Sequence, residues 1–502
     1  MRDRENNDNN QLTSGRLLAR NTIFNLIGQG APIIVAIFTI PILIKELGTD
    51  RFGVLTLAWI IVGYFSLFDL GISRALTKLV AEKLGAGRQH ELHAIIWTSM
   101  FLMMILGLIM ALVVSMLSPL LVQKILKIPD ALQQETLNSF YLLAISIPVV
   151  ISTAGLRGIL EAYQCFGFIN AIRIPMGILT FLGPLAVLPF SQSLFPVVAV
   201  LAAGRAIAWA VNLLFCFHIM PSLRNNISLK KEIIKPLFYV GGWMTISNII
   251  GTLMVYLDRF LIGALVSVSA VAYYATPFEV VTKLLIIPGA FVGVLFPAFS
   301  TSFAQDPNRT ALIFRRGVKY VFLALFPIIL VTITFAYEGL NLWLGSEFAQ
   351  HSTNVLQWLA VGVLFNCLAI IPFALIQGVG RPDLTAKLHM IELPCYLITL
   401  WLLLLSRGIE GAAIAWFVRA AVDSFSLFGI AYMLLPAIPG IISQMTFIIG
   451  GVLVFTGFAS LTIGLTMKGL FILITLSAFA LVTWLRFLTP EERALIKEHI
   501  KG

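Results

Sequence analysis

The stretch TISNIIGTLMVYLDRFLIG, Thr245–Gly263, lies close to the midpoint of this 502-residue chain. Its opening heptapeptide TISNIIG repeats the earlier TIFNLIG at Thr22–Gly28. Each copy begins a long apolar run and stands at the head of about six such runs. The sequence therefore predicts two similar halves, an arrangement typical of membrane proteins built from internal repeats.

The composition excludes a soluble globular chain. Hydrophobic residues make up 59% and charged residues only 12% of the sequence, and the mean hydropathy is +0.94. Soluble domains carry about 25% charged residues, so most of this surface faces something other than water. The net charge is +10, but the cations sit in short loops between apolar segments. That pattern favours control of membrane topology over nucleic-acid binding, and we expect no nucleic-acid partner.

Apolar segments long enough to cross a membrane recur about fourteen times along the chain. They are helices, because lipid offers no hydrogen-bonding partner to an open backbone. The predicted fold class is an all-α integral membrane protein with about 14 transmembrane helices. The predicted parts are a cytosolic tail at 1–20, a six-helix lobe at 21–228, a second six-helix lobe at 229–440, an added helix pair at 441–486 and a cytosolic tail at 487–502.

The distribution of the cations gives an orientation. With the N-terminus inside, 24 of the 34 Lys and Arg side chains fall in inner segments and seven in outer loops. This split follows the positive-inside rule and predicts an even number of spans with both termini cytosolic. Three cations remain inside apolar segments, namely Arg205, Lys283 and Arg419.

Arg205 lies in the sixth apolar segment and Arg419 at a similar depth in the twelfth. A guanidinium stays protonated and its fork matches phosphate oxygens, so both are candidate binding groups for an anionic substrate. The alternative is equally open: each arginine is tied to a carboxylate in its own bundle. Asp423, four residues after Arg419, is the obvious local partner and is also a candidate for ion coupling or gating.

The eighth segment, TPFEVVTKLLIIPGAFVGVLFPAF, holds Glu279 and Lys283. They are four residues apart and share one helix face, so they can pair. Pro277, Pro288 and Pro297 predict a kinked or broken helix, which suits a moving gate. Lys283 is therefore a candidate substrate-binding residue and Glu279 a candidate coupling or gating residue. The alternative is an internal pair that neutralises itself.

Two further carboxylates are candidates for ion coupling or gating. Asp69 ends the second apolar segment, where a helix-end contact is as plausible as a role in the transport path. Asp258 stands beside Arg259 at the outer end of the seventh segment and is a weaker candidate, as is Glu392 in the eleventh.

Three common sequence motifs of nucleotide-binding proteins and hydrolases are absent from the sequence. There is no GxxxxGK[ST] phosphate loop, no HExxH and no GxSxG, so we expect no catalytic residues and no cofactor. The four cysteines form no CxxC pair. His90 and His93 have helical spacing but lie in a basic loop, and we expect the six histidines to form no metal site.

Three blocks carry a family resemblance. LGTDRFGVLTLAWIIVGYFSLFDLGISRALTKLVAEKLGAG (Leu47–Gly87), GWMTISNIIGTLMVYLDRFLIG (Gly242–Gly263) and VAYYATPFEVVTKL (Val271–Leu284) resemble the polysaccharide transporter family. Its members are flippases of lipid-linked oligosaccharides, in the superfamily that also holds the multidrug and toxic-compound extrusion pumps. The resemblance spans roughly residues 16–435.

The resemblance implies a V-shaped molecule of two six-helix lobes in the bacterial cytoplasmic membrane. It implies export of an undecaprenyl-pyrophosphate-linked oligosaccharide from the inner to the outer leaflet, driven by an H⁺ or Na⁺ gradient. It also implies a cationic central cavity, an expectation that falls on Arg205, Lys283 and Arg419. Membrane lipid and a polysaccharide polymerase are the other implied partners.

Two alternatives stay open at the level of sequence. A multidrug or cation-coupled exporter of the same superfamily would have a cavity richer in carboxylates and aromatic rings than in cations. A membrane enzyme such as a polysaccharide polymerase would need a large external loop with catalytic residues. The outer loops here are short and poor in paired acids, so the enzyme ranks last.

Overall fold

The computed structural model describes residues 15–435 and 464–488, together with 490 and 493. Short gaps fall at 65–68, 70, 86–87, 164, 225, 290, 293–294, 296–298, 300–302 and 304–305. Every element in these ranges is helical. The predicted N-terminal tail up to residue 14, most of the first helix of the predicted added pair and most of the C-terminal tail lie outside the described residues.

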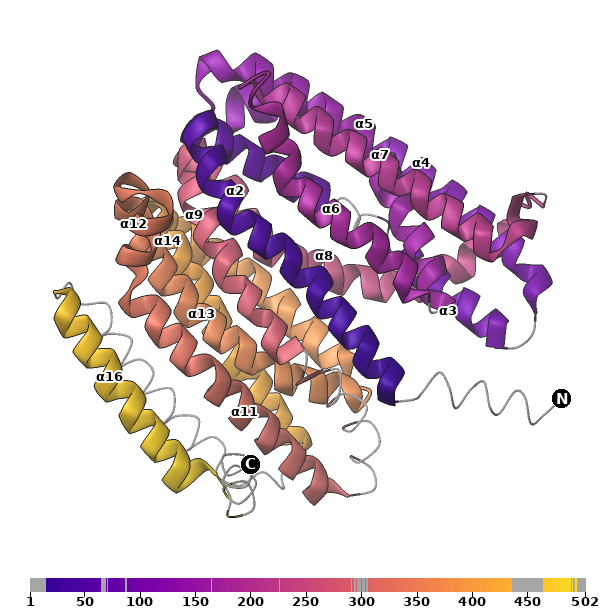
Figure 1. Ribbon diagram of the computed structural model, residues 1–502. Coiled ribbons are helices and arrows are strands. Elements are labelled where there is room, and N and C mark those ends of the chain that lie inside the picture. The colour runs from indigo at the N-terminus through magenta and orange to yellow at the C-terminus, as the bar shows by residue number, and fades with distance from the viewer. Residues whose placement is uncertain are drawn as a thin grey trace. The chain divides into compact units, whose positions relative to one another are not determined.

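The first compact unit covers Met1–Ala272. Its helices are α2 (Gly15–Tyr64), α3 (Ile72–Gly85), α4 (Leu92–Leu120), α5 (Asp130–Ala162), α6 (Phe166–Val187), α7 (Leu194–Ile219) and α8 (Ile234–Leu265). α5 packs against both α4 and α7, and α6 packs against α7 and α2 (Figure 1). α7 contains Arg205 and forms the sixth apolar segment of the sequence.

The second compact unit covers Tyr273–Gly502. Its helices are α9 (Val268–Thr282), which begins in the first unit, α11 (Pro307–Thr334), α12 (Ala336–Leu344), α13 (Ser346–Gly378), α14 (Pro382–Leu434) and α16 (Leu465–Val482). α13 packs against α11, α12 and α14, and α16 runs along α11 (Figure 1). The units divide after Ala272, whereas the sequence places the start of the second lobe at residue 229. The six-helix lobes stay a prediction.

Short turns of 3₁₀ or π geometry complete the described elements. They lie at Gln89–Glu91, Leu121–Ile125, Pro221–Arg224, Lys231–Ile233, Lys283–Leu285 and Thr483–Phe487. The turn at Lys283–Leu285 follows α9 directly, so the eighth apolar segment departs from α-helix within the stretch where its prolines predict a break.

Nine of the described helical segments are long and apolar enough to cross a membrane. Their exposed surfaces are apolar as well: on α4, Leu108 is 57%, Leu112 58% and Met116 71% exposed. A soluble protein rarely exposes a continuous apolar face of this kind, whereas lipid covers it without cost. The fold is an all-helical membrane fold, and the total of fourteen spans stays a prediction.

Two long helices contain a glycine break. α2 is interrupted at Gly48, with φ 78°, and α14 at Gly408, with φ 58°. Glycine adopts these left-handed angles because it has no Cβ. The break at Gly408 separates the eleventh apolar segment, which holds Glu392, from the twelfth, which holds Arg419, so each forms one limb of α14.

A glycine contact fixes the second limb of α14 against α13. A Cβ on Gly362 would lie 2.6 Å from Cζ3 of Trp416 and 3.2 Å from Cα of Phe417. Trp416 is 1% exposed and also packs edge-on against Phe278 of α9, with ring centroids 5.3 Å apart. The missing side chain at Gly362 therefore leaves room for the indole ring, one turn before Arg419.

The junction of α3 and α4 is held by an ion pair outside the membrane-spanning segments. Lys83 Nζ donates to Glu91 Oε2 at 2.6 Å. This hydrogen bond, with the charge of Lys83, holds the pKa of the Glu91 carboxyl below its usual range.

Candidate functional site: a charge cluster in α14 and isolated charges in other helices

α14 brings charged side chains together from both sides of its glycine break. His389 and Glu392 belong to the limb before Gly408, and Arg419 and Asp423 belong to the limb after it. The ion pair between residues 389 and 423 shows that the two limbs lie side by side. We call His389, Glu392, Arg419 and Asp423 the α14 charge cluster.

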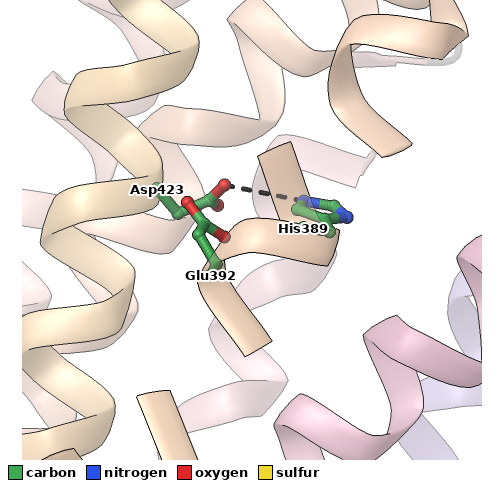
Figure 2. A group of neighbouring side chains, drawn as sticks. All are labelled: His389, Glu392 and Asp423. Carbon is green, nitrogen blue, oxygen red and sulfur yellow. Dashed lines mark ion pairs between the residues drawn. The ribbon is translucent and has the colours of Figure 1, made fainter. Parts of the chain in front are cut away.

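Three of its members converge. His389 Nε2 lies 3.6 Å from Asp423 Oδ1, and Figure 2 shows the Glu392 carboxylate beside that of Asp423. One ligand atom from each of the three side chains can be chosen so that all lie within 4.8 Å of one another. Glu392 is 6% and Asp423 7% exposed. Neither oxygen of Glu392 has a hydrogen-bond partner among the described residues.

Arg419 supplies a fixed positive charge beside the carboxylates. It is 8% exposed, and its guanidinium carbon lies 5.6 Å from the ring centroid of Trp416 and 5.9 Å from that of Tyr396. These distances permit a cation–π attraction to each ring. Within the described residues Arg419 forms no ion pair closer than 4.0 Å with Asp423, although the two are four residues apart.

The cluster can bind a cation or share a proton. An imidazole and two carboxylates are ligands for metal ions, and the same groups exchange protons near neutral pH when buried together. Phe373 of α13 stacks parallel to the His389 imidazole, with centroids 6.2 Å apart, and shields that face of the ring.

Sequence reasoning identified Arg419 and Asp423, ranked Glu392 as a weaker candidate and missed His389. Two local spacings carried a signal: residues 389 and 392 share one helix face, as do 419 and 423. The sequence does not reveal that these faces meet, because the break at Gly408 decides which sides of the limbs touch.

Arg205 lies on α7 and is partly exposed. Among the described residues it forms no ion pair or hydrogen bond. Its neighbour Gly204 faces Leu179 and Met176 of α6, so α6 and α7 approach closely at this level. Arg205 is thus a cation in an apolar helix. Among the described residues of its unit, no carboxylate forms an ion pair with it.

Glu279 and Lys283 form the predicted pair. Lys283 Nζ donates to Glu279 Oε2 at 3.0 Å, and the side chains are 46% and 44% exposed. The pair lies at the end of α9, where the helix passes into the 3₁₀ turn. Its position at a change of helical geometry leaves both the gating role and the self-neutralising role possible.

Asp258 and Arg259 are placed differently from the prediction. The sequence puts them at the outer end of the seventh apolar segment, but α8 continues to Leu265 and both side chains are fully buried. Arg259 Nη1 lies 3.3 Å from Asp258 Oδ1 and donates to the carbonyl oxygen of Val255 at 2.7 Å. The helix therefore runs past both charges, which form an ion pair within it.

Asp69 caps the start of α3. Its Oδ1 accepts from the backbone N–H of Gly71 and its Oδ2 from that of Ser73, both at 2.9 Å. The carboxylate satisfies N–H groups that a helix start leaves open. This geometry matches the helix-end contact that the sequence left as one of two possibilities.

Comparisons with known proteins place the chain. Residues 18–303 match the family model "Polysaccharide biosynthesis protein". A protein of Shigella flexneri named "Putative O-antigen transporter" is 33% identical over 421 residues, covering 82% of this chain and 96% of that protein. A protein of Haloferax volcanii named "Probable low-salt glycan biosynthesis flippase Agl15" is 26% identical over 227 residues, covering 45% of this chain and 46% of that protein.

Solved structures share the fold. An inward-facing multidrug resistance MATE family transporter of the MOP superfamily superposes with a TM-score of 0.69 at 15% identity, covering 82% of this chain and 96% of that one. At this identity the likeness concerns the fold alone. With the family match and the transporter relative, it leads to one conclusion: the chain belongs to the polysaccharide biosynthesis protein family, as a multi-pass membrane transporter and not an enzyme.

Proposed function

We propose that this chain flips undecaprenyl-pyrophosphate-linked oligosaccharide repeat units from the cytosolic to the outer leaflet of the bacterial cytoplasmic membrane. The product feeds synthesis of a surface polysaccharide such as O-antigen, capsule or exopolysaccharide. The observation that carries the proposal is a 33% identity to a protein named "Putative O-antigen transporter", over 96% of that protein's length and 82% of this chain. Both termini are proposed to lie in the cytosol, because most cations then fall inside.

The polar headgroup of the lipid-linked oligosaccharide is what prevents the lipid from crossing the bilayer unaided. A pyrophosphate and a hydrophilic glycan cannot enter hydrocarbon without losing hydration that nothing there replaces. Alternating access solves this if fixed cations replace the lost hydration on the way. A membrane potential that is negative inside assists outward movement of the anion, by about 2.3 kcal/mol per charge per 100 mV.

Among the predicted substrate residues, Arg205 fits this role best, because no described carboxylate neutralises it. Lys283 is paired with Glu279, and Arg419 belongs to the α14 charge cluster. Among the predicted coupling residues, Asp423 fits best. It is buried beside an imidazole and a second carboxylate, whereas Asp69 is bound by backbone N–H groups.

The leaflet location of the lipid intermediate tests the proposal. In a strain without this gene, lipid-linked oligosaccharide should accumulate on the cytosolic leaflet and surface polymer should be lost. Completed units that reach the outer leaflet but stay unpolymerised would refute flipping and favour a polymerase. Normal intermediates with altered drug sensitivity would refute it in favour of a multidrug exporter.

A further inference from the structure

The α14 charge cluster buries more negative than fixed positive charge. Glu392 and Asp423 can each carry a negative charge, Arg419 carries a positive one, and His389 is neutral or positive. We propose that His389, Glu392 and Asp423 together bind one exchangeable proton, and that this proton is the ion whose gradient drives the transporter. The second half of the proposal rests on the proposed flippase function, but proton binding itself does not.

The Glu392 carboxylate lies among the other side chains of the α14 charge cluster without a hydrogen-bond partner in the described residues. The chosen ligand atoms lie within 4.8 Å of one another, and His389 Nε2 is 3.6 Å from Asp423 Oδ1 (Figure 2). Glu392 is 94% buried, and its oxygens have no hydrogen-bond partner in the described ranges. A buried carboxylate without a partner is unfavourable when charged, and a proton removes that charge.

Counting charges gives the number of protons. With none bound, the two carboxylates and Arg419 leave the cluster with a net charge of −1. One proton adds one positive charge and makes the cluster neutral, whether Glu392, Asp423 or His389 holds it. The three groups lie close enough to exchange that proton. A second proton would leave a positive charge buried beside Arg419. The one-proton state is therefore the stable state of the closed site, and the empty state needs access to water.

A proton fits this donor set better than a metal ion. Na⁺ and other hard cations prefer cages of oxygen ligands, whereas the third group here is an imidazole nitrogen. A divalent ion would leave one positive charge in excess, because the two carboxylates already share the charge of Arg419 within the cluster. A proton needs no coordination cage and leaves the cluster neutral.

Neighbouring helices meet α14 through aromatic rings. Inside the cluster, the charges of Asp423 and Arg419 act on Glu392. Against α14, α13 places the apolar ring of Phe373 on His389, α9 packs through Phe278 on Trp416, and α11 packs through Phe314 on Phe428. The titratable and charged groups that neighbour these contact residues in sequence are the mutually paired Glu279 and Lys283 on α9, Arg315 and Arg316 on α11, and Cys367 on α13. Tyr396 of α14 lies beside Arg419.

Proton exchange changes the attraction between the two limbs of α14. His389 and Glu392 lie on one limb, and Asp423 lies on the other. When Glu392 or Asp423 gives up the proton, both carboxylates are negative and lie on opposite limbs, which favours separation of the limbs or entry of water. This gives the gradient a direct means of acting on one helix pair of the second unit.

Infrared difference spectroscopy of the purified full-length protein tests proton binding without a transport assay. Between about pH 5 and pH 8, where coupled carboxylates titrate, the wild type should lose a protonated-carboxyl signal. E392Q and D423N should remove or shift this signal. D383N is the matched control, because Asp383 lies on the same helix but is exposed and paired with Arg381 at 3.0 Å; it should keep the signal.

A wild type without such a pH-dependent signal would overturn the proposal, and this measurement does not depend on whether a variant folds. A signal that survives in both E392Q and D423N would also overturn it. So would a rise in the thermal midpoint of the wild type, at fixed pH, with NaCl or ZnCl₂ that E392Q lacks, because the occupant would then be a metal ion.

The two proposals fail separately. A pH-dependent cluster signal with normal leaflet distribution of the lipid in the deletion strain would keep the proton site and refute the flippase. Loss of flipping in the deletion strain, with no cluster signal in the wild type, would keep the flippase and refute the proton site. If both hold, E392Q should lose flipping in cells at normal membrane levels, while D383N retains it.

Discussion

The close contact between Gly362 and Trp416 predicts how much stability the protein should lose when Gly362 is replaced by alanine. In G362A the new methyl carbon would lie 2.6 Å from Cζ3 and 2.7 Å from Cε3 of Trp416. Carbon atoms make their best contact at about 3.5–4.0 Å, so α13 or the indole must move by about 1 Å. The indole is fully buried and Phe417 Cα stands 3.2 Å from the same point, so neither can move freely.

Overpacking of this kind costs about 1–3 kcal/mol. Alanine is favoured over glycine inside a helix by about 1 kcal/mol, which offsets part of the cost. G429A on α14 is the matched control, because a Cβ there meets nothing within 4 Å. Both substitutions carry the helix gain, so the difference between them isolates the clash. G362A should therefore be less stable than G429A by about 1–3 kcal/mol.

The assay is thermal unfolding of the purified protein in detergent, with wild type, G362A and G429A side by side. A double substitution adds a check, since G362A should be less harmful in a W416L background, where the obstructing ring is gone. An unfolding midpoint of G362A equal to or above that of G429A would refute the close packing of α13 on α14.

Three further predictions concern other parts of the chain. R205A should reduce export of lipid-linked oligosaccharide at least tenfold at normal membrane levels, whereas R224A, outside the spans, should not; equal export by both would remove Arg205 from the substrate path. G408A should lower stability by about 1–3 kcal/mol through backbone strain alone, because φ is 58° there and no atom lies within 4 Å of a new Cβ; unchanged unfolding would argue against the break in α14. E91Q should lower the thermal midpoint near neutral pH, where the lowered pKa keeps Glu91 charged beside Lys83. The gap to wild type should close as the pH falls through that pKa, because the stability contributed by a depressed carboxyl is lost on protonation; a gap that widens in acid would contradict this.

Features that depend on one helix at a time could be predicted from the sequence. α7 matches its apolar segment, and Glu279 pairs with Lys283 because a spacing of four residues places both on one helix face. The sequence placed Asp258 and Arg259 at the end of the seventh segment, because hydropathy falls at charged residues. The helix itself continues to Leu265, because its backbone hydrogen bonding does not depend on side-chain charge. His389 was missed because its partner is Asp423, on another limb. Their meeting depends on the rotation of two packed helices, which no local pattern specifies.

The buried pair in α8 has a consequence for how the protein is made. Asp258 and Arg259 contact each other and the carbonyl of Val255 within a single helix, so this ion pair can form before any neighbouring helix has been synthesised. A lone aspartate or arginine at mid-span penalises insertion by about 2.5–3.5 kcal/mol. A helix that neutralises itself can leave the translocon as an independent segment and wait in lipid for the rest of the chain. Replacing one partner alone should therefore impair membrane integration more than replacing both.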